Sequence, residues 1–195
     1  MNIPFSNRIS GVQPSAIREI LKLSADPSII SFAAGNPSED AFPVETVKKI
    51  TDEILTETPI AALQYSLTEG YPALRQTLKR RMLAQGIGRE DEEILIMSGA
   101  QQGIELATKC LVNEGDVVIC EDPSFVGALN TFRSYGAQLV GVEMEHDGIN
   151  LEKLEAALKE NPNTKLIYLI PTFQNPSGIT TSLKKRKACY ELAKK

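Results

Sequence analysis

The chain has 195 residues, of which 42% are hydrophobic and 24% are charged, as is typical of a globular protein with a substantial core. Its net charge of −4 argues against a nucleic-acid partner, because such a partner requires a clustered basic surface. No apolar stretch approaches the length of a membrane span, and the first residues, "MNIPFSNRIS", lack the apolar core of a signal peptide. We therefore expect no binding to nucleic acid or membranes.

The chain contains three cysteines and one histidine. Cys110, Cys120 and Cys189 are widely spaced and lie in segments that we expect to be buried, which indicates reduced thiols and a cytoplasmic location. His146 precedes an Asp-Gly pair and is interpreted as a surface turn residue. These residues predict neither a disulfide framework nor a metal site, and they leave little material for imidazole chemistry.

The first ninety residues are predicted to form an irregular arm followed by helices. Apolar residues recur at helical spacing over 14–23 and again over 44–55. Between these segments lies a Gly-Asn-Pro-Ser loop at 35–38, after a short apolar run. Pro72 is placed to stand in the first turn of a helix that ends near Leu83.

From residue 92 onward, short apolar runs alternate with helical patterns. This alternation predicts an α/β fold with a mainly parallel sheet and helices on both of its faces, a three-layer αβα arrangement. Gly136 is expected to end the second of these helices, and Asn150 to cap the third. The predicted strands are 93–97, 116–121, 137–144 and 165–170, and the predicted helices are 100–112, 124–136 and 150–160.

The last segment, 181–195, is predicted to be a helix capped by Thr181 or Ser182. In an alternating fold this helix leads into a further strand, and no such strand follows it here. We therefore expect the sheet to be incomplete at the C-terminal end. Its open edge should pair with another copy or a complementary chain, or else aggregate.

Three loops follow predicted strands, at the edge where open parallel sheets bind ligands: 98–103, 121–125 and 171–178. The first, "SGAQQG", places a hydroxyl and a glycine before a helix, where free N–H groups and the helix dipole favour an anion such as phosphate. It matches neither the P-loop nor the dinucleotide-binding glycine pattern. It could also be a plain strand–helix turn.

The other two loops offer an aromatic ring and an amide. Phe125 could stack on a flat ligand or pack in the core. Asn175 could bind a ligand oxygen, with Pro176 restricting its backbone, or could belong to a turn that leads into a helix. Together the three loops describe a ligand with a phosphate, a planar ring and a ring oxygen. That is the outline of pyridoxal 5′-phosphate (PLP).

Motifs that run over nearly the whole chain carry a family resemblance. The chain resembles the N-terminal half of a PLP-dependent, fold-type-I class I/II aminotransferase, nearest the 2-aminoadipate, kynurenine and aromatic aminotransferase branch. The same module occurs in regulators of the MocR type. The resemblance implies that 1–45 form an N-terminal arm and part of a small domain, and that 46–195 form part of the PLP-binding large domain. The motifs are "SAIREILKL", "ISFAAGNPSEDAFP", "LQYSLTEGYPALR", "SGAQQGIELATKCLVNEGDVV", "EDPSF" and "YLIPTFQNPSG".

The resemblance implies a role in cofactor binding for seven residues. Phe125 would stack on the PLP ring, where most members of this branch carry tyrosine. Asn175 would hydrogen-bond the phenolic oxygen of the ring. Tyr65 would reach across a homodimer interface to the phosphate in the neighbouring site. The phosphate itself would be held by Ser98, Gly99, Ala100 and Gln101.

For the substrate, the resemblance implies that Gly35 lies in a loop that closes over the carboxylate, and that Asn175 also takes part in substrate binding. Arg18 occupies a position where some relatives bind an acidic side chain, although it could also be a solvated helix residue. The prolines that follow Asp122 and Asn175 match positions where a cis peptide bond is common. The resemblance implies amino acid and 2-oxo acid substrates.

The reaction also requires a lysine bonded to the PLP aldehyde, a carboxylate at the pyridine nitrogen and an arginine for the substrate carboxylate. The resemblance places all three beyond the last helix. Residues 182–185, "SLKK", contain Ser-x-x-Lys but match the solvent-exposed crossover helix. We therefore expect the N-terminal portion of an enzyme that transfers an amino group from an amino acid to a 2-oxo acid, with the fragment itself inactive.

Two other readings stay open. The chain could be a non-catalytic half-domain that binds PLP or a partner chain, or part of a MocR-type regulator, although residues 1–90 already match the enzyme's own N-terminal arm. A nucleotide-binding Rossmann-like protein is disfavoured, because the glycine patterns of such proteins are missing.

Overall fold

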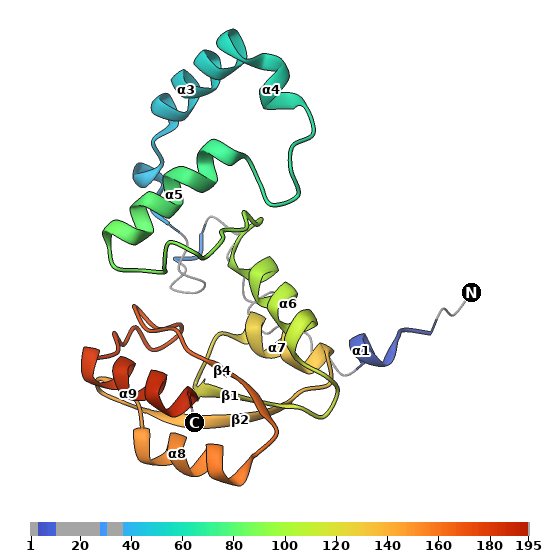
Figure 1. The fold of residues 1–195 in the computed structure, drawn as a ribbon, viewed down its shortest axis with the longest axis vertical. Helices are drawn as coiled ribbons and strands as arrows, with labels where there is room; N and C mark the ends of the chain where they lie inside the picture. The colour runs from blue at the N-terminus through green and yellow to red at the C-terminus, as the bar shows by residue number, and fades with distance from the viewer. Residues whose placement is uncertain (1–3, 11–27, 31–36, 195) are drawn as a thin grey trace. The chain divides into compact units, whose positions relative to one another are not determined.

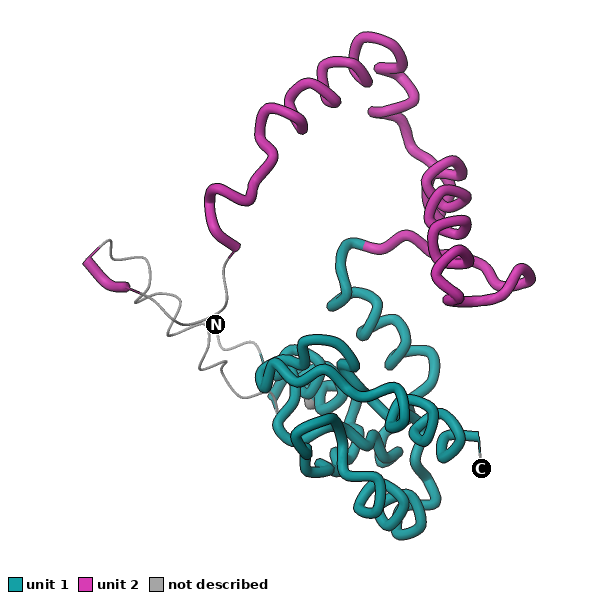
Figure 2. The backbone as a smooth tube through the Cα atoms, turned by 90° about the vertical axis from the view of Figure 1, so that its left-hand side faces the viewer, with its two compact units in different colours: residues 1–15, 98–195 teal, residues 16–97 magenta. Residues whose placement is uncertain are grey.

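The computed structural model describes residues 4–10, 28–30 and 37–194. The chain divides into two compact units, shown in separate colours in Figure 2. One unit comprises residues 98–195 together with 1–15, and the other comprises residues 16–97. Each unit is described separately below.

The unit of residues 16–97 is helical over the part that is described. After a short 3-10 helix, Glu39–Ala41, helix α3 spans Val44–Glu57, so the helix predicted over 44–55 is confirmed. Helix α4 spans Pro59–Leu63 and helix α5 spans Pro72–Ala84. Pro72 stands in the first turn of α5, as predicted, where its missing N–H costs no helical hydrogen bond.

The strand predicted over 93–97 is wrong, because residues 92–97 form no ladder. Two of their backbone groups bond instead to residues near and within α5: Ile96 N–H donates to Glu69 O at 3.0 Å, and Ile94 O accepts from Arg75 Nε at 2.7 Å. An apolar, β-branched run becomes a strand only where another strand lies alongside it, and among the described residues none does here.

The unit of residues 98–195 is built on a four-stranded sheet in the order β3-β2-β1-β4. Strand β1 (Val117–Asp122) pairs in parallel with both β2 (Gln138–Glu145) and β4 (Thr164–Tyr168). Strand β3 (Gly148–Ile149) is antiparallel to β2. The mainly parallel sheet is thus confirmed, and in the described residues β4 pairs on one side only.

Helices cover both faces of the sheet, which confirms the three-layer arrangement (Figure 1). Helices α6 (Ala100–Leu111) and α7 (Val126–Ser134) pack on the face that carries Val118. Helices α8 (Leu151–Glu160) and α9 (Leu183–Ala193) pack on the face that carries Val117 and Ile119. Successive side chains of β1 therefore pack into two separate cores, one on each face of the sheet. This explains why the apolar residues of β1 follow one another without interruption.

The predicted helix ends are also found. Asn150 Oδ1 accepts from Lys153 N–H at 2.9 Å and caps α8, and Ser182 Oγ accepts from Lys185 N–H at 3.4 Å and caps α9. Gly136 follows α7 with φ +76°, the left-handed conformation that favours glycine after a helix. His146 lies in the turn between β2 and β3, as expected.

All three cysteines are free thiols, and Cys120 and Cys189 are buried as expected. Cys110 is exposed, which corrects the expectation that it is buried. Cys110 lies about halfway around α6 from Thr108, which is fully buried. No helix among the described residues is long and apolar enough to span a membrane.

Candidate active site

The candidate site lies at the carboxyl ends of the parallel strands. Because β1 and β4 run in the same direction, the loop of 122–125 and the loop of 169–182 leave the same edge of the sheet. Helix α6 packs beside α7 on one face of the sheet. The predicted residues of this unit lie in these two loops and at the start of α6.

The start of α6 has the features of an anion site. Gly99 adopts φ +87°, and a Cβ at this position would meet only open space. Ser98, Gly99 and Ala100 are exposed, so the first N–H groups of the helix face solvent. Ser98 N–H donates to Gln102 Oε1 at 2.6 Å, so the Gln102 side chain is part of this turn.

Gln101 and Phe125 meet over Gly127, at the start of α7. Gln101 Nε2 donates to Thr131 Oγ1 at 2.7 Å and lies 3.4 Å from Gly127 O. A Cβ at Gly127 would lie 2.5 Å from Phe125 Cζ and 2.6 Å from Gln101 Oε1. The missing side chain of Gly127 therefore creates the space that the aromatic ring and the amide share. An aromatic ring that also packs against the core of Val118 and Phe132 thus lies beside the start of α6, and these are the residue types that a ligand with a flat ring and an anion would need.

Asn175 lies in a loop that is tied to the end of β1 through its neighbour Gln174. Gln174 is 1% exposed, and its Nε2 donates to Pro123 O at 2.7 Å and to Glu121 Oε2 at 3.2 Å. Asn175 itself is exposed. The Asp122–Pro123 and Asn175–Pro176 peptide bonds are both cis, which confirms the prediction for these positions.

A buried carboxylate lies beneath these loops. Glu121 is 2% exposed, and burial raises the pKa of its carboxyl above the ordinary value, although hydrogen bonds from Ile170 N–H at 3.0 Å and from Gln174 act in the opposite direction. On α9, Arg186 donates to Pro171 O at 2.6 Å and to Thr181 O at 2.8 Å. These contacts fasten both ends of the loop that carries Asn175.

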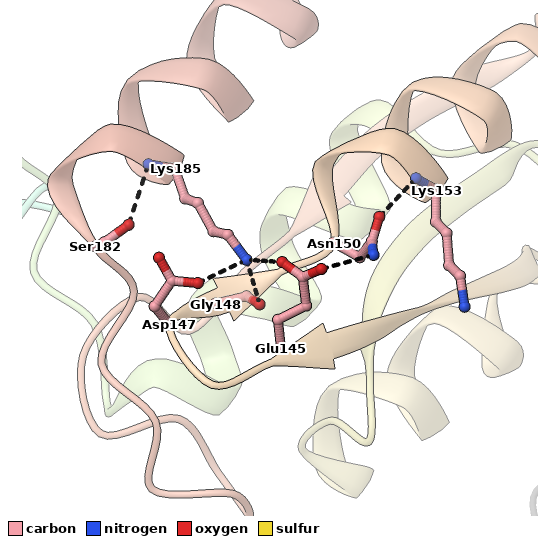
Figure 3. Close-up of polar contacts among 7 residues, drawn as sticks. All are labelled: Glu145, Asp147, Gly148, Asn150, Lys153, Ser182 and Lys185. Atoms are coloured by element: carbon pink, nitrogen blue, oxygen red, sulfur yellow. Dashed lines mark hydrogen bonds and ion pairs between the residues drawn. The ribbon is translucent and has the colours of Figure 1, made fainter.

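Lys185, the lysine of the Ser-x-x-Lys match, is not part of this site (Figure 3). Its side chain is 9% exposed, and its ammonium is paired with Glu145 and, at 2.8 Å, with Asp147. Desolvation lowers its pKa, but the hydrogen bonds to Asp147 and Glu145 outweigh that effect and leave the pKa raised. The expectation of a solvent-exposed position is wrong for Lys185, because α9 turns it onto the β2–β3 hairpin.

The remaining predicted residues lie elsewhere. Tyr65 belongs to the unit of residues 16–97 and is 99% exposed. Arg18 and Gly35 lie outside the described residues. In the described part of the chain, no group of three or more His, Cys, Asp or Glu side chains could hold a metal ion.

Several residues that build this site were missed by the sequence analysis. The sequence contained a signal for one of them, Glu121, which directly follows four apolar residues of a buried strand. A carboxylate is expected at such a position only if it accepts hydrogen bonds. The others depend on contacts between residues far apart in the sequence. The missed residues are Gln102, Glu121, Gly127, Thr131, Gln174 and Arg186.

Comparison with known proteins agrees with this geometry. The family model described as "Aminotransferase class I and II" matches residues 27–195. An aromatic-amino-acid aminotransferase of Thermococcus litoralis is 38% identical, over 97% of this chain and 46% of that protein. A 2-aminoadipate transaminase of Thermus thermophilus is 41% identical, over 96% of this chain and 46% of that protein.

Solved structures of aminotransferases also resemble this chain. The crystal structure of Pyrococcus horikoshii kynurenine aminotransferase in complex with PMP superposes with a TM-score of 0.89 at 37% identity, over 97% of this chain and 48% of that one. More distant relatives include HTH-type transcriptional regulators, such as YdcR of Escherichia coli K12, which is 32% identical over 36% of its own length. This chain thus spans about half the length of the aminotransferases that it matches.

Proposed function

Because this chain belongs to the aminotransferase class I and II family, we propose that it supplies phosphate and ring contacts to PLP in an aminotransferase. The enzyme would transfer an amino group from an amino acid to a 2-oxo acid. One observation carries the proposal: the start of α6, the Phe125–Gly127 cradle and the Asn175 loop are linked by hydrogen bonds at one edge of the sheet.

The start of α6 would hold the phosphate. The N–H groups of 99–101 and the Ser98 hydroxyl would be the donors, and the positive end of the helix dipole stabilises a dianion there. Gln101 would orient this turn through its bond to Thr131 on α7. These residues bind and position the group through fixed dipoles that need no rearrangement.

Phe125 and Asn175 would hold the ring. When bound, PLP supplies an electron sink for the bond that breaks at the substrate α-carbon. Phe125 would cover one face of the ring and exclude water from it. The Asn175 amide would donate to the phenolic oxygen, which stabilises negative charge there.

The proposal extends to residues outside this edge of the sheet. Tyr65 would contact the phosphate of a second copy in a homodimer, and its full exposure leaves it available for such a contact. Gly35 and Arg18 would bind the substrate. The assignment of 46–195 to the PLP-binding large domain, of 1–45 to the arm and small domain, and of the enzyme to the cytoplasm belongs to the same proposal.

The chain by itself is proposed to hold PLP without turning over substrate. In the described part of the chain, none of the hydrogen bonds or ion pairs made by lysines involves a residue of this site. Lys185 is occupied by Glu145 and Asp147. We propose that the proton-transferring lysine is supplied by polypeptide outside this chain.

Borohydride reduction in the presence of PLP tests this proposal. The purified chain is titrated with PLP by fluorescence, reduced, and analysed by intact mass and peptide mapping. We expect saturable PLP binding that Asn175→Ala weakens about tenfold, the equivalent of one hydrogen bond, and no stoichiometric adduct on a single lysine. Asn163→Ala, in a loop at the opposite ends of the strands, is the matched control. Binding that Asn175→Ala leaves unchanged, or one stoichiometric adduct at Lys185, would contradict the assignment.

The regulators among the relatives support a second candidate function, in which this module binds PLP as part of a MocR-type protein without transamination. The two functions differ in turnover. A longer protein containing this chain is expected to convert a 2-oxo acid in the presence of an amino donor if it is an enzyme. PLP binding without such conversion would favour the second candidate.

A further inference from the structure

We infer that Gln174 is a positioning residue. Through hydrogen bonds to the buried Glu121 carboxylate and to Pro123 O, it fixes the position of the Asn175 loop relative to the loop that leads to Phe125. The hydrogen-bond network stands on its own, and its link to PLP rests on the proposed function. Gln174 does not need to touch the cofactor, because it acts through the residue that follows it.

The side-chain amide of Gln174 uses its full hydrogen-bonding capacity. Its Nε2 has two N–H donors, which reach Pro123 O at 2.7 Å and Glu121 Oε2 at 3.2 Å. Its Oε1 accepts from Ser177 N–H at 2.8 Å and from Ser177 Oγ at 2.6 Å. A buried amide with all four bonds made has one favoured orientation.

The backbone of Gln174 closes the loop that the side chain anchors. Its N–H donates to Ile179 O at 2.9 Å, and its carbonyl accepts from Gly178 N–H at 2.5 Å. Asn175 lies inside this closed turn. Because the anchor is the residue directly before Asn175, a change in its seating moves the Asn175 side chain.

The other side of the contact is the end of β1. Glu121 is the penultimate residue of β1, and Pro123 precedes Phe125 by two residues. Glu121 also accepts from Ile170 N–H at 3.0 Å, so the carboxylate joins the ends of β1 and β4. One amide thus fixes two loops that are 51 residues apart in the sequence.

Few other side chains could replace this amide. An apolar residue at 174 would leave Pro123 O and Ser177 N–H without this partner, and both of these hydrogen bonds are partly buried. A glutamate would face Glu121 and Pro123 O with a second negative charge. Chemistry as well as shape therefore selects glutamine at this position.

Hydrogen exchange tests the anchoring without any cofactor. Gln174→Met keeps the length of the side chain and removes its donors and acceptor. We expect amide exchange in peptides covering 169–181 to rise at least tenfold, while peptides of β2 and α8 keep their wild-type rates and report that the fold is intact. Gln85→Met, the same change at an exposed glutamine that follows α5, is the matched control and should leave exchange over 169–181 unchanged.

A milder variant covers the case in which Gln174→Met does not fold. Ser177→Ala removes the hydroxyl bond to Gln174 Oε1 and the bond that this hydroxyl accepts from Ile179 N–H at 3.3 Å, and it is expected to raise exchange over 174–180 by a smaller factor. Wild-type exchange rates over 169–181 in Gln174→Met, or in Ser177→Ala if the first does not fold, would overturn the anchoring.

A double-mutant cycle with PLP separates positioning from simple stabilisation. Gln174→Met should weaken PLP binding about tenfold in the wild-type background and hardly at all in the Asn175→Ala background, because the amide that it positions is then gone. Equal effects in both backgrounds would overturn the positioning role. If the wild-type chain binds no PLP, the proposed cofactor site has failed, and the exchange data alone decide whether Gln174 anchors the loop.

Discussion

Lys185 Nζ, on α9, lies 2.8 Å from Asp147 Oδ1 in the turn between β2 and β3. The same ammonium is paired with Glu145 and donates to Gly148 O at 3.2 Å (Figure 3). In addition, Ser182 N–H donates to Asp147 O at 2.9 Å. The start of α9 is therefore fixed to this hairpin. The loop that carries Asn175 ends at α9, so its far end is fixed as well.

Lys185→Met should destabilise the unit of residues 98–195. The methionine keeps the apolar stem but leaves Glu145 and Asp147 without their partner. Since both carboxylates are partly exposed, we expect a loss of about 1–2 kcal/mol in the free energy of unfolding. Urea unfolding followed by circular dichroism measures this loss. Lys159→Met, on the exposed face of α8, is the control, and an equal loss in the two variants would contradict the prediction.

The contribution of this cluster should be lost at both extremes of pH. The hydrogen bond from Lys185, followed by that from Ser182, lowers the pKa of Asp147 below the ordinary value of 3.8. The stability contributed by Asp147 is therefore present above 3.8 and is lost as the pH falls through the lower, folded-state value.

At the basic end, Lys185 has a pKa above the ordinary value of 10.5, so its contribution is complete below 10.5 and is lost as the pH rises through the folded-state value. Unfolding midpoints across pH measure both limbs. Asp147→Asn should flatten the acid limb, whereas Asp91→Asn, an exposed control, should not. An acid limb that persists in Asp147→Asn would show that other carboxyls produce it.

The three thiols should differ in reactivity. Cys110 is exposed, whereas burial raises the pKa of the Cys120 thiol to about 11 and also raises that of Cys189. At pH 8 only about one Cys120 in a thousand would be a thiolate. Iodoacetamide should therefore modify Cys110 first in the native chain, and all three cysteines in urea. Peptide mapping identifies the sites, and early modification of Cys120 would contradict its burial.

Gly127→Ala should weaken PLP binding without unfolding the chain. The added methyl would lie 2.5 Å from Phe125 Cζ, which forces the ring out of its place. We expect a loss of affinity of about tenfold in a fluorescence titration, which corresponds to about 1.4 kcal/mol. In the Phe125→Ala background the same change should cost little, because the ring is no longer there. A full loss in that background would mean that Gly127 acts in another way.

Much of the fold could be predicted because its signals are local. The apolar run of β1, the Asn150 and Ser182 caps and Gly136 after α7 act within a few residues of the chain. The apolar run at 93–97 has the same composition as a strand and forms none. Strand formation depends on a neighbour that composition does not specify.

The loops that carry the candidate site could be predicted from the sequence, but the residues that hold these loops in place could not. Phe125 and Asn175 follow strands at the ligand-binding edge, a position that the order of elements reveals. The contact between Gln174 and Glu121 joins residues that are 53 positions apart, and no pattern of sequence spacing predicts it. Lys185 shows the same limit, because a helix pattern does not say which residues will meet a distant hairpin.

Helices α8 and α9 lie on the same face of the sheet, and this placement determines on which side of β4 a strand that follows α9 would pair. Connections between parallel strands are almost always right-handed. The α8 connection carries the chain from β2 past β1 to β4, so a right-handed connection through α9 would continue the same way. Any parallel strand reached through α9 would lie against the outer edge of β4. Such a strand would make β4 an interior strand, on the side of the sheet away from the β2–β3 hairpin.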